Sequence, residues 1–258
     1  MKKKHLILTL ITALMMVLLL AGCGGGESAS APEKHEIAVA EGYETAQDDL
    51  GADAYGGWCD NPDTQYFAIN DYYNMASEGS LHILSNFETY QQTTEYTCGP
   101  ASAHMVINWF DGDIEKYDEM TIADITGCKP DTGVLAEGLV KVFDEMGWDY
   151  QVNKDGDYYY ETLEAFEADV IKNIDAGVPM MIAWMDWSGH WEVIIGIDTM
   201  QEDNPSDDVL IVADPYDTSD HYQDGYYVVP AERFYYMWNC VFPGDDLAQS
   251  FIVAQPAE

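Results

Sequence analysis

The chain has 258 residues and a formal net charge of −37, with 47 acidic residues against 10 basic ones. This excess of acid excludes a nucleic-acid-binding protein, because lysine and arginine must neutralise phosphates, and it disfavours acidic ligands in general. A cationic peptide is the kind of partner that such a field attracts. Aromatic residues make up 13% of the chain, which is enough for the core of one domain of ordinary size.

The chain begins with a segment typical of secretion. A cationic start precedes one apolar run, LILTLITALMMVLLLA, which is shorter than the roughly 20 residues of a transmembrane helix. The following tetrad, Leu20-Ala21-Gly22-Cys23, resembles the lipobox of bacterial lipoproteins. The resemblance implies a signal peptide over residues 1–22 and a lipid such as palmitate on Cys23. The alternative is an ordinary secretory signal that is cleaved nearby.

A lipid on the first mature residue implies a location. The mature protein is expected to be anchored to the extracellular face of the bacterial membrane and not to span it. Loss of the signal peptide removes three lysines and no acid, so the mature net charge is −40, with 7 basic against 47 acidic residues.

The next residues are expected to connect the anchor to the folded part. Residues 23–54 are rich in small and polar side chains and are predicted to be a flexible tether. Residues 55–80 contain many aromatic side chains and are interpreted as an N-terminal arm. The arm either regulates access to the cleft or completes the core, and our hypothesis is that it is structural, because its aromatic side chains need burial. Residues 81–87 alternate in polarity and predict a strand.

The middle of the chain has the apolar period of helices. In the first helix the apolar side chains fall on one face, with Ala101, Met105 and Trp109 among them. A strand, WDYQV, precedes the last helix. Helices are predicted over residues 98–110, 120–127, 134–147 and 162–177.

The last third changes to short apolar runs separated by turn residues. Strands are predicted over residues 178–185, 190–199, 209–215 and 225–231, followed by an aromatic turn. Helices followed by a mostly antiparallel sheet indicate an α+β domain over residues 81–245. Residues 246–258 are predicted to be a C-terminal tail.

Cys98 is the candidate nucleophile. It stands at the start of a predicted helix, where the helix dipole stabilises a thiolate, and Gly99 allows a substrate to approach the backbone closely. The alternative is a small buried cysteine with a structural role.

Three further residues could complete a catalytic site. His190 opens an apolar strand, and Asp214 ends another, where a carboxylate needs a partner such as a histidine N–H. Gln92 lies in a polar loop before Cys98 and could donate to an oxyanion, although Gln91 competes for this role. The alternatives are a loop-capping histidine, an Asx turn and a solvated glutamine.

The ordered set of QTTEYTCGPASA, SGHWEVIIGID and VADPY resembles papain-like cysteine peptidases, and more narrowly the bacteriocin-processing double-glycine peptidases. The resemblance covers about residues 81–245 and implies a papain-like fold. It implies Cys98 as nucleophile, His190 as base and then acid, Asp214 as orienter of His190, and Gln92 as oxyanion donor. The reaction would be peptide hydrolysis through a thioester.

The sequence departs from those peptidases in two ways. They often carry an acid just before the cysteine, where this chain has Thr97, and they usually precede an ABC exporter, which this chain lacks. A substrate other than a bacteriocin leader is therefore expected. Two alternatives stay open: another acyl-transfer enzyme, such as a transglutaminase-like enzyme or a peptidoglycan amidase, and a catalytically silent peptide-binding module.

The remaining polar residues suggest no cofactor and no metal. The histidines lack metal-ligand spacing with the cysteines, and the acidic segments at 111–115, 153–157 and 203–208 are interpreted as solvated turns rather than calcium sites. Cys59, Cys128 and Cys240 leave at most one disulfide among them. We expect a monomer that acts on a peptide or protein substrate.

Overall fold

A computed structural model describes most of the chain after the predicted tether. The described residues belong to one compact unit, Lys34–Glu258. The predicted signal peptide, Cys23, the tether and most of the arm lie outside them, as do Cys59 and Cys240. The described ranges are 70–153, 159–186, 189–201, 204–217, 224–239 and 248–257.

The helices in these ranges lie close to the predicted ones. Two of them, α3 and α4, end at Gly127 and Gly147, whose φ angles of 74° and 69° suit a residue without a side chain. No helix in the described ranges is long and apolar enough to cross a membrane. The α-helices are α2 (Cys98–Trp109), α3 (Glu119–Thr126), α4 (Ala136–Met146), α5 (Leu163–Asp175) and α6 (Ala231–Trp238), with short 3₁₀ turns η2 (Tyr72–Asn74) and η4 (Pro205–Asp207).

The strands form one sheet of seven in which all pairs are antiparallel. Six strands follow the order β2-β7-β3-β4-β5-β6, and β1 pairs with the second half of β4. The strands are β1 (Leu81–Ile83), β2 (Trp148–Asn153), β3 (Met180–Trp184), β4 (His190–Asp198), β5 (Val209–Ala213), β6 (Tyr226–Pro230) and β7 (Ser250–Pro256). This confirms the α+β class with a mostly antiparallel sheet.

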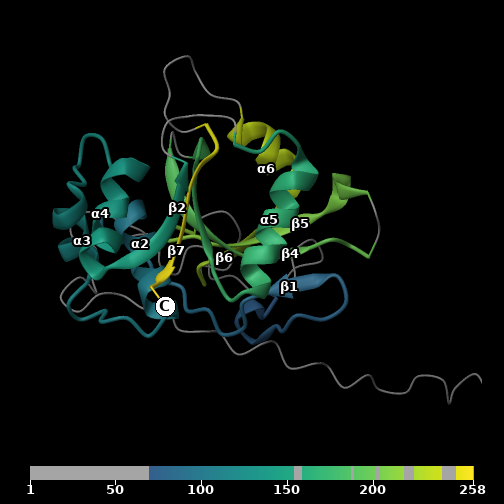
Figure 1. Ribbon diagram of the computed structural model, residues 1–258, viewed down its shortest axis with the longest axis horizontal. Coiled ribbons are helices and arrows are strands. Elements are labelled where there is room, and N and C mark those ends of the chain that lie inside the picture. The colour runs from purple at the N-terminus through teal and green to yellow at the C-terminus, as the bar shows by residue number, and fades with distance from the viewer. Residues whose placement is uncertain are drawn as a thin grey trace, which may run out of the picture. The chain divides into compact units, whose positions relative to one another are not determined.

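Helices cover both faces of the sheet (Figure 1). Helices α2, α3 and α4 gather on one side, and α5 and α6 lie on the other. Strand β4 is contacted by α2 and by α5, which places it in the middle of the core.

Helix α2 is buried more completely than its pattern predicts. We expected one apolar face, but every residue from Cys98 to Ile107 is buried. The reason is tertiary, because α3, α4 and β4 all pack around α2. The start of α2 therefore lies in the interior and not on a helix that rests on the surface.

Two elements near the C-terminus extend the fold beyond the prediction. Residues 231–238 form helix α6 where we expected an aromatic turn, with Ala231, Phe234, Tyr235 and Trp238 buried at helical spacing. The predicted tail, 246–258, contains β7, which lies between β2 and β3. The folded domain therefore continues past residue 245.

The described end of the N-terminal arm packs on this core. Tyr72, Tyr73 and Met75 are partly buried against it, and the Tyr72 ring lies 6.1 Å from the Tyr226 ring. These contacts are those expected of a structural arm.

Candidate active site

Cys98 is the first residue of α2 and is 9% exposed. Thr97 is the N-cap residue, but its side chain makes no capping hydrogen bond. Its hydroxyl instead donates to Glu119 Oε1 and lies 2.7 Å from the Thr94 hydroxyl. The Thr97 side chain therefore leaves the first backbone N–H groups of α2 uncapped, and the positive end of the helix dipole lies at Cys98. This arrangement can stabilise negative charge at the sulfur.

A buried carboxylate holds the loop that leads to Cys98. Glu119, at the start of α3, is fully buried and accepts hydrogen bonds from the Tyr90 hydroxyl, from the N–H and hydroxyl of Thr93, and from Thr97. Burial raises the pKa of Glu119, and these four donors oppose the rise. The Tyr90–Thr97 loop is thus tied to α3 at several points, which fixes the approach to the nucleophile.

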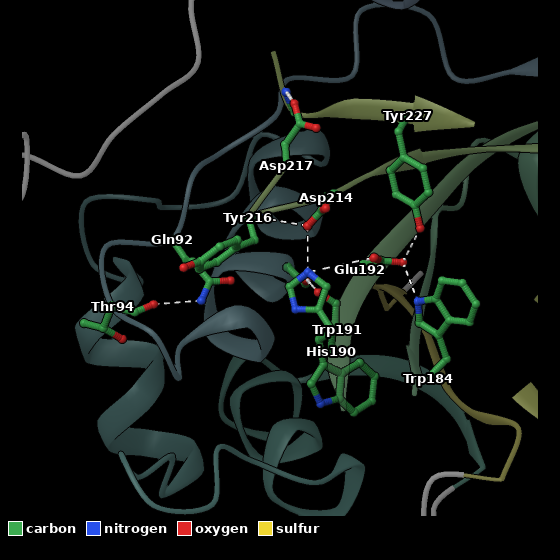
Figure 2. A network of polar contacts seen from close by, with 12 residues as sticks. Gln92, Thr94, Trp184, His190, Trp191, Glu192, Asp214, Tyr216, Asp217 and Tyr227 are labelled. Atoms are coloured by element: carbon green, nitrogen blue, oxygen red, sulfur yellow. Dashed lines mark hydrogen bonds and ion pairs between the residues drawn. The ribbon is translucent and has the colours of Figure 1, made fainter. Parts of the chain in front are cut away.

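His190 and Asp214 are brought together as the sequence predicts. His190 begins β4, Asp214 follows β5, and both are buried. His190 Nε2 lies 2.6 Å from Asp214 Oδ1, which also accepts the backbone N–H of Tyr216 at 2.8 Å (Figure 2). Asp214 therefore fixes the orientation of the imidazole ring.

His190 also interacts with Cys98. Burial lowers the pKa of His190, but the charge and hydrogen bond of Asp214 and a hydrogen bond with the Cys98 side chain outweigh burial. Together they raise the pKa of His190 well above its ordinary value. Because Asp214 occupies Nε2, Nδ1 is the ring nitrogen left for Cys98. The three residues thus form one connected set whose imidazole favours the protonated state.

Gln92 is attached to the same region through its backbone. Its N–H donates to the carbonyl of Pro215, the residue after Asp214, at 2.8 Å. Its side-chain Nε2 donates to the Thr94 carbonyl at 2.7 Å, and the amide carries a second N–H that can serve an oxyanion. Gln91 is also buried, and its Nε2 has no hydrogen-bond partner in the described part of the chain. The geometry thus keeps both glutamines as candidates, with Gln92 the one anchored beside Asp214.

Glu192, which the sequence patterns did not single out, is fully buried on β4. Its Oε2 accepts hydrogen bonds from Trp184 Nε1 at 2.9 Å and from the Tyr227 hydroxyl at 2.8 Å, and its Oε1 lies 3.8 Å from His190 Nε2 (Figure 2). A signal was present in the sequence, because a glutamate in an apolar strand two residues after His190 must share the histidine's face of the sheet.

His190, Glu192 and Asp214 form the one cluster in the described ranges with metal-like spacing, with ligand atoms within 4.8 Å of one another. The 2.6 Å contact between His190 and Asp214 has the length of a charge-assisted hydrogen bond between these two residues. We therefore assign the cluster to proton chemistry. The absence of a metal and of a cofactor remains a prediction.

Two other titratable residues have structural surroundings. His104 Nδ1 lies 3.0 Å from the Tyr117 carbonyl, and burial lowers the pKa of His104. Cys128 is a free cysteine whose thiol donates to the Tyr96 carbonyl, and burial, together with the charge of Cys98, raises its pKa to about 12. Cys128 thus remains a protonated thiol at neutral pH.

One comparison with known protein families identifies a family for most of the described chain. Residues 84–241 match the model of the Peptidase_C39 like family. No curated protein matches the sequence significantly. Among solved structures, the peptidase domain of Streptococcus ComA, a bi-functional ABC transporter involved in a quorum-sensing pathway, aligns with 16% identity and a TM-score of 0.43. That alignment covers 66% of this chain and 99% of that chain.

Proposed function

Because the chain belongs to the Peptidase_C39 like family, we propose that it is a cysteine peptidase in which Cys98, His190 and Asp214 form the catalytic triad. The observation that carries this proposal is the connected set at the start of α2. A buried imidazole is held by Asp214 on one nitrogen, and the Cys98 side chain acts on the same imidazole and raises its pKa. This is the arrangement that converts a thiol into a thiolate paired with an imidazolium.

In the first step the Cys98 thiolate attacks the carbonyl carbon of a peptide bond. Negative charge then develops on the carbonyl oxygen, where the backbone N–H of Cys98 and the Gln92 side-chain amide would donate hydrogen bonds. The C–N bond breaks, the His190 imidazolium gives its proton to the leaving amine, and a thioester remains on Cys98.

In the second step water attacks the thioester. His190, now neutral, accepts a proton from this water, and the C–S bond breaks to release a carboxylic acid and the Cys98 thiolate. Asp214 remains ionised throughout, because its role is to orient the imidazole and to stabilise its positive charge.

The first test measures alkylation of Cys98 by iodoacetamide as a function of pH, followed by mass spectrometry of the peptide that contains Cys98. A free thiol titrates near pH 8.5. We expect the wild-type protein to react at pH 5 to 6 and His190→Ala to lose this reactivity. Cys128 is the internal control, because burial and the charge of Cys98 raise its pKa to about 12 and it should not react in this range.

Equal reactivity of the two proteins at pH 5 to 6 would show that no thiolate–imidazolium pair exists and would favour a peptide-binding module. If the pair exists, cleavage of a mixture of synthetic peptides by the wild type, and not by Cys98→Ala, separates a peptidase from other acyl-transfer enzymes. The products show whether a peptide bond or a side-chain amide has been hydrolysed.

The proposal includes a place and a substrate class. Cys23 in its lipobox-like tetrad supports a lipid-anchored protein on the extracellular face of the membrane, and the net charge of −37 supports a cationic peptide or protein substrate. Cys23→Ala should abolish incorporation of labelled palmitate into the protein, which the wild type should show. Labelling of this variant equal to that of the wild type would contradict lipid attachment at Cys23.

A further inference from the structure

A second buried carboxyl group faces the His190–Asp214 pair. The β4–β5 register ends with the pair Val193 and Ala213, so the next residues in each direction, Glu192 and Asp214, face each other just beyond it, and their ligand atoms lie within 4.8 Å of one another. Residues directly opposite each other share a face of the sheet, and His190 shares that face because it stands two residues before Glu192. The sheet register therefore brings two carboxyl groups and an imidazole together in the buried interior.

The hydrogen bonds of the two carboxyl groups are incomplete in the same way. Each has one oxygen with two partners: Oδ1 of Asp214, with His190 and Tyr216, and Oε2 of Glu192, with Trp184 and Tyr227. The other oxygens, Asp214 Oδ2 and Glu192 Oε1, are buried without a hydrogen-bond partner in the described ranges. If both carboxyl groups were ionised, neither of these two oxygens would have a hydrogen-bond donor. If one of the carboxyl groups is protonated, its O–H group is a donor.

Asp214 is better placed than Glu192 to keep a negative charge. Asp214 is in hydrogen-bond contact with the imidazole at 2.6 Å, whereas the nearest Glu192 oxygen lies 3.8 Å from the same nitrogen. The donors to Glu192 are both neutral. Two neighbouring buried carboxylates rarely both ionise, so the one with the weaker cationic contact takes the proton.

We propose that Glu192 is a positioning residue of the catalytic site: a neutral carboxylic acid, held by Trp184 and Tyr227, that leaves Asp214 as the single anionic partner of His190. This inference rests on the proposed function. Consistent with it, burial and the charge of Asp214 raise the pKa of Glu192 to about 8, although the charge of His190 and the Tyr227 hydrogen bond act in the opposite direction.

The titratable groups that act on Glu192 come from β4 itself and from the three strands β3, β5 and β6 or the residues that follow them. They are His190 on β4, Asp214 after β5, Tyr227 on β6 and Asp186 after β3. Burial, followed by the charges of Glu192 and Asp214, raises the pKa of Tyr227 well above its ordinary value, so Tyr227 remains a donor. Above about pH 8 Glu192 becomes a second anion beside the imidazolium, which then holds its proton to higher pH.

The test compares the pH profile of Cys98 alkylation in the wild type and in Glu192→Gln. The amide keeps the size and neutrality of the acid but cannot ionise. We expect the alkylation rate below pH 6, the acid limb of the profile, to be the same in both proteins. The alkaline inflection, where His190 loses its proton, should move to lower pH by about one unit. A shift of both limbs would show that Glu192 is already ionised, and two unchanged limbs would show that it does not act on His190, so either result overturns the inference.

The control is Glu167→Gln on α5. Burial also raises the pKa of Glu167 to about 8, but its charged neighbours are Asp208 and Glu164, so its replacement should leave both limbs in place. Should Glu192→Gln not fold, Tyr227→Phe carries the test. It removes one donor to Glu192 and leaves Trp184, so Glu192 stays neutral to higher pH and the alkaline inflection moves down by a smaller amount. An unmoved inflection in folded Tyr227→Phe overturns the inference.

Failure of the inference and failure of the proposed function give different results. Without a catalytic pair, the wild type itself reacts like a free thiol and has no acid limb below pH 6. If the Cys98–His190 pair exists but Glu192 has no role, the wild type still reacts below pH 6. In that case the alkaline inflection of Glu192→Gln and of Tyr227→Phe does not move.

Discussion

Two buried glutamates contact different residues of the candidate site, and their surroundings differ: Glu119 accepts a hydrogen bond from Thr97, and Glu192 lies near His190. Glu119, on the helical side, accepts hydrogen bonds from Tyr90, Thr93 and Thr97 through both of its oxygens. Glu192, on the sheet side, has two donors on one oxygen and a histidine 3.8 Å from the other. Burial raises the pKa of both carboxyl groups.

The difference separates a structural carboxyl group from one that responds to a reaction. A carboxylate whose oxygens are satisfied by donors of a loop holds that loop, and its removal leaves the donors unpaired in the interior. A carboxyl group with a bare oxygen beside an imidazole can exchange protons when the imidazole changes charge. We therefore expect Glu119 to control stability and Glu192 to control the pH dependence of the site.

The largest expected effect is on the structural side. Glu119→Ala leaves the hydroxyls of Tyr90, Thr93 and Thr97 without their acceptor and should lower the free energy of unfolding by about 3–4 kcal/mol in urea denaturation. The matched control is Glu137→Ala, because Glu137 also lies in the first turn of a helix but is exposed. A loss in Glu119→Ala no larger than in the control would contradict a structural role.

The second effect is a pH dependence of stability caused by Glu192. Its pKa is about 8 in the folded protein and about 4.5 in the unfolded chain, so the folded state binds the proton more tightly. The contribution of protonated Glu192 to the stability of the folded state is complete below about pH 4.5 and is lost as pH rises towards 8. The unfolding free energy of the wild type relative to Glu192→Gln should therefore fall by a few kcal/mol between pH 4.5 and 8. A constant difference over this range would mean that Glu192 is not a buried neutral acid.

The smallest effect concerns the residue before the nucleophile. Thr97→Val removes one of the donors to Glu119 and should cost about 1 kcal/mol in the same denaturation experiment, because three donors remain. Thr97→Ser keeps the hydroxyl and should cost less. A cost for Thr97→Val equal to that of Glu119→Ala would show that Thr97 alone carries the network.

Local periodicity was sufficient for most helices and strands. The 3.6-residue pattern predicted α4 and α5, and continuous apolar runs predicted β3, β4 and β5, to within a few residues at each end. It did not reveal that α2 is buried on all sides, because burial of a whole helix depends on the elements that surround it. Nor did it predict β7, because the position of the last strand between β2 and β3 is a long-range pairing.

In the candidate site, too, some residues could be predicted from local sequence and others depend on contacts between distant segments. Cys98, His190 and Asp214 could be chosen from the sequence, because each stands at the end of a regular element next to a glycine or a proline. Gln92 could be chosen only from its place in the polar loop before Cys98. Glu192 was overlooked, because its importance comes from a cross-strand neighbour, Asp214, that lies far away in the sequence.

The sequence by itself determined the class of fold, the candidate nucleophile and the order of its partners, since these depend on local periodicity and on residue types at element ends. Only the tertiary structure decided which buried polar side chains lie within contact distance of one another. The register of β4 and β5 places Glu192 opposite Asp214, and the packing around Glu119 uses the Thr97 hydroxyl that would otherwise cap α2. Both outcomes depend on distances between segments far apart in the chain, which no local pattern specifies.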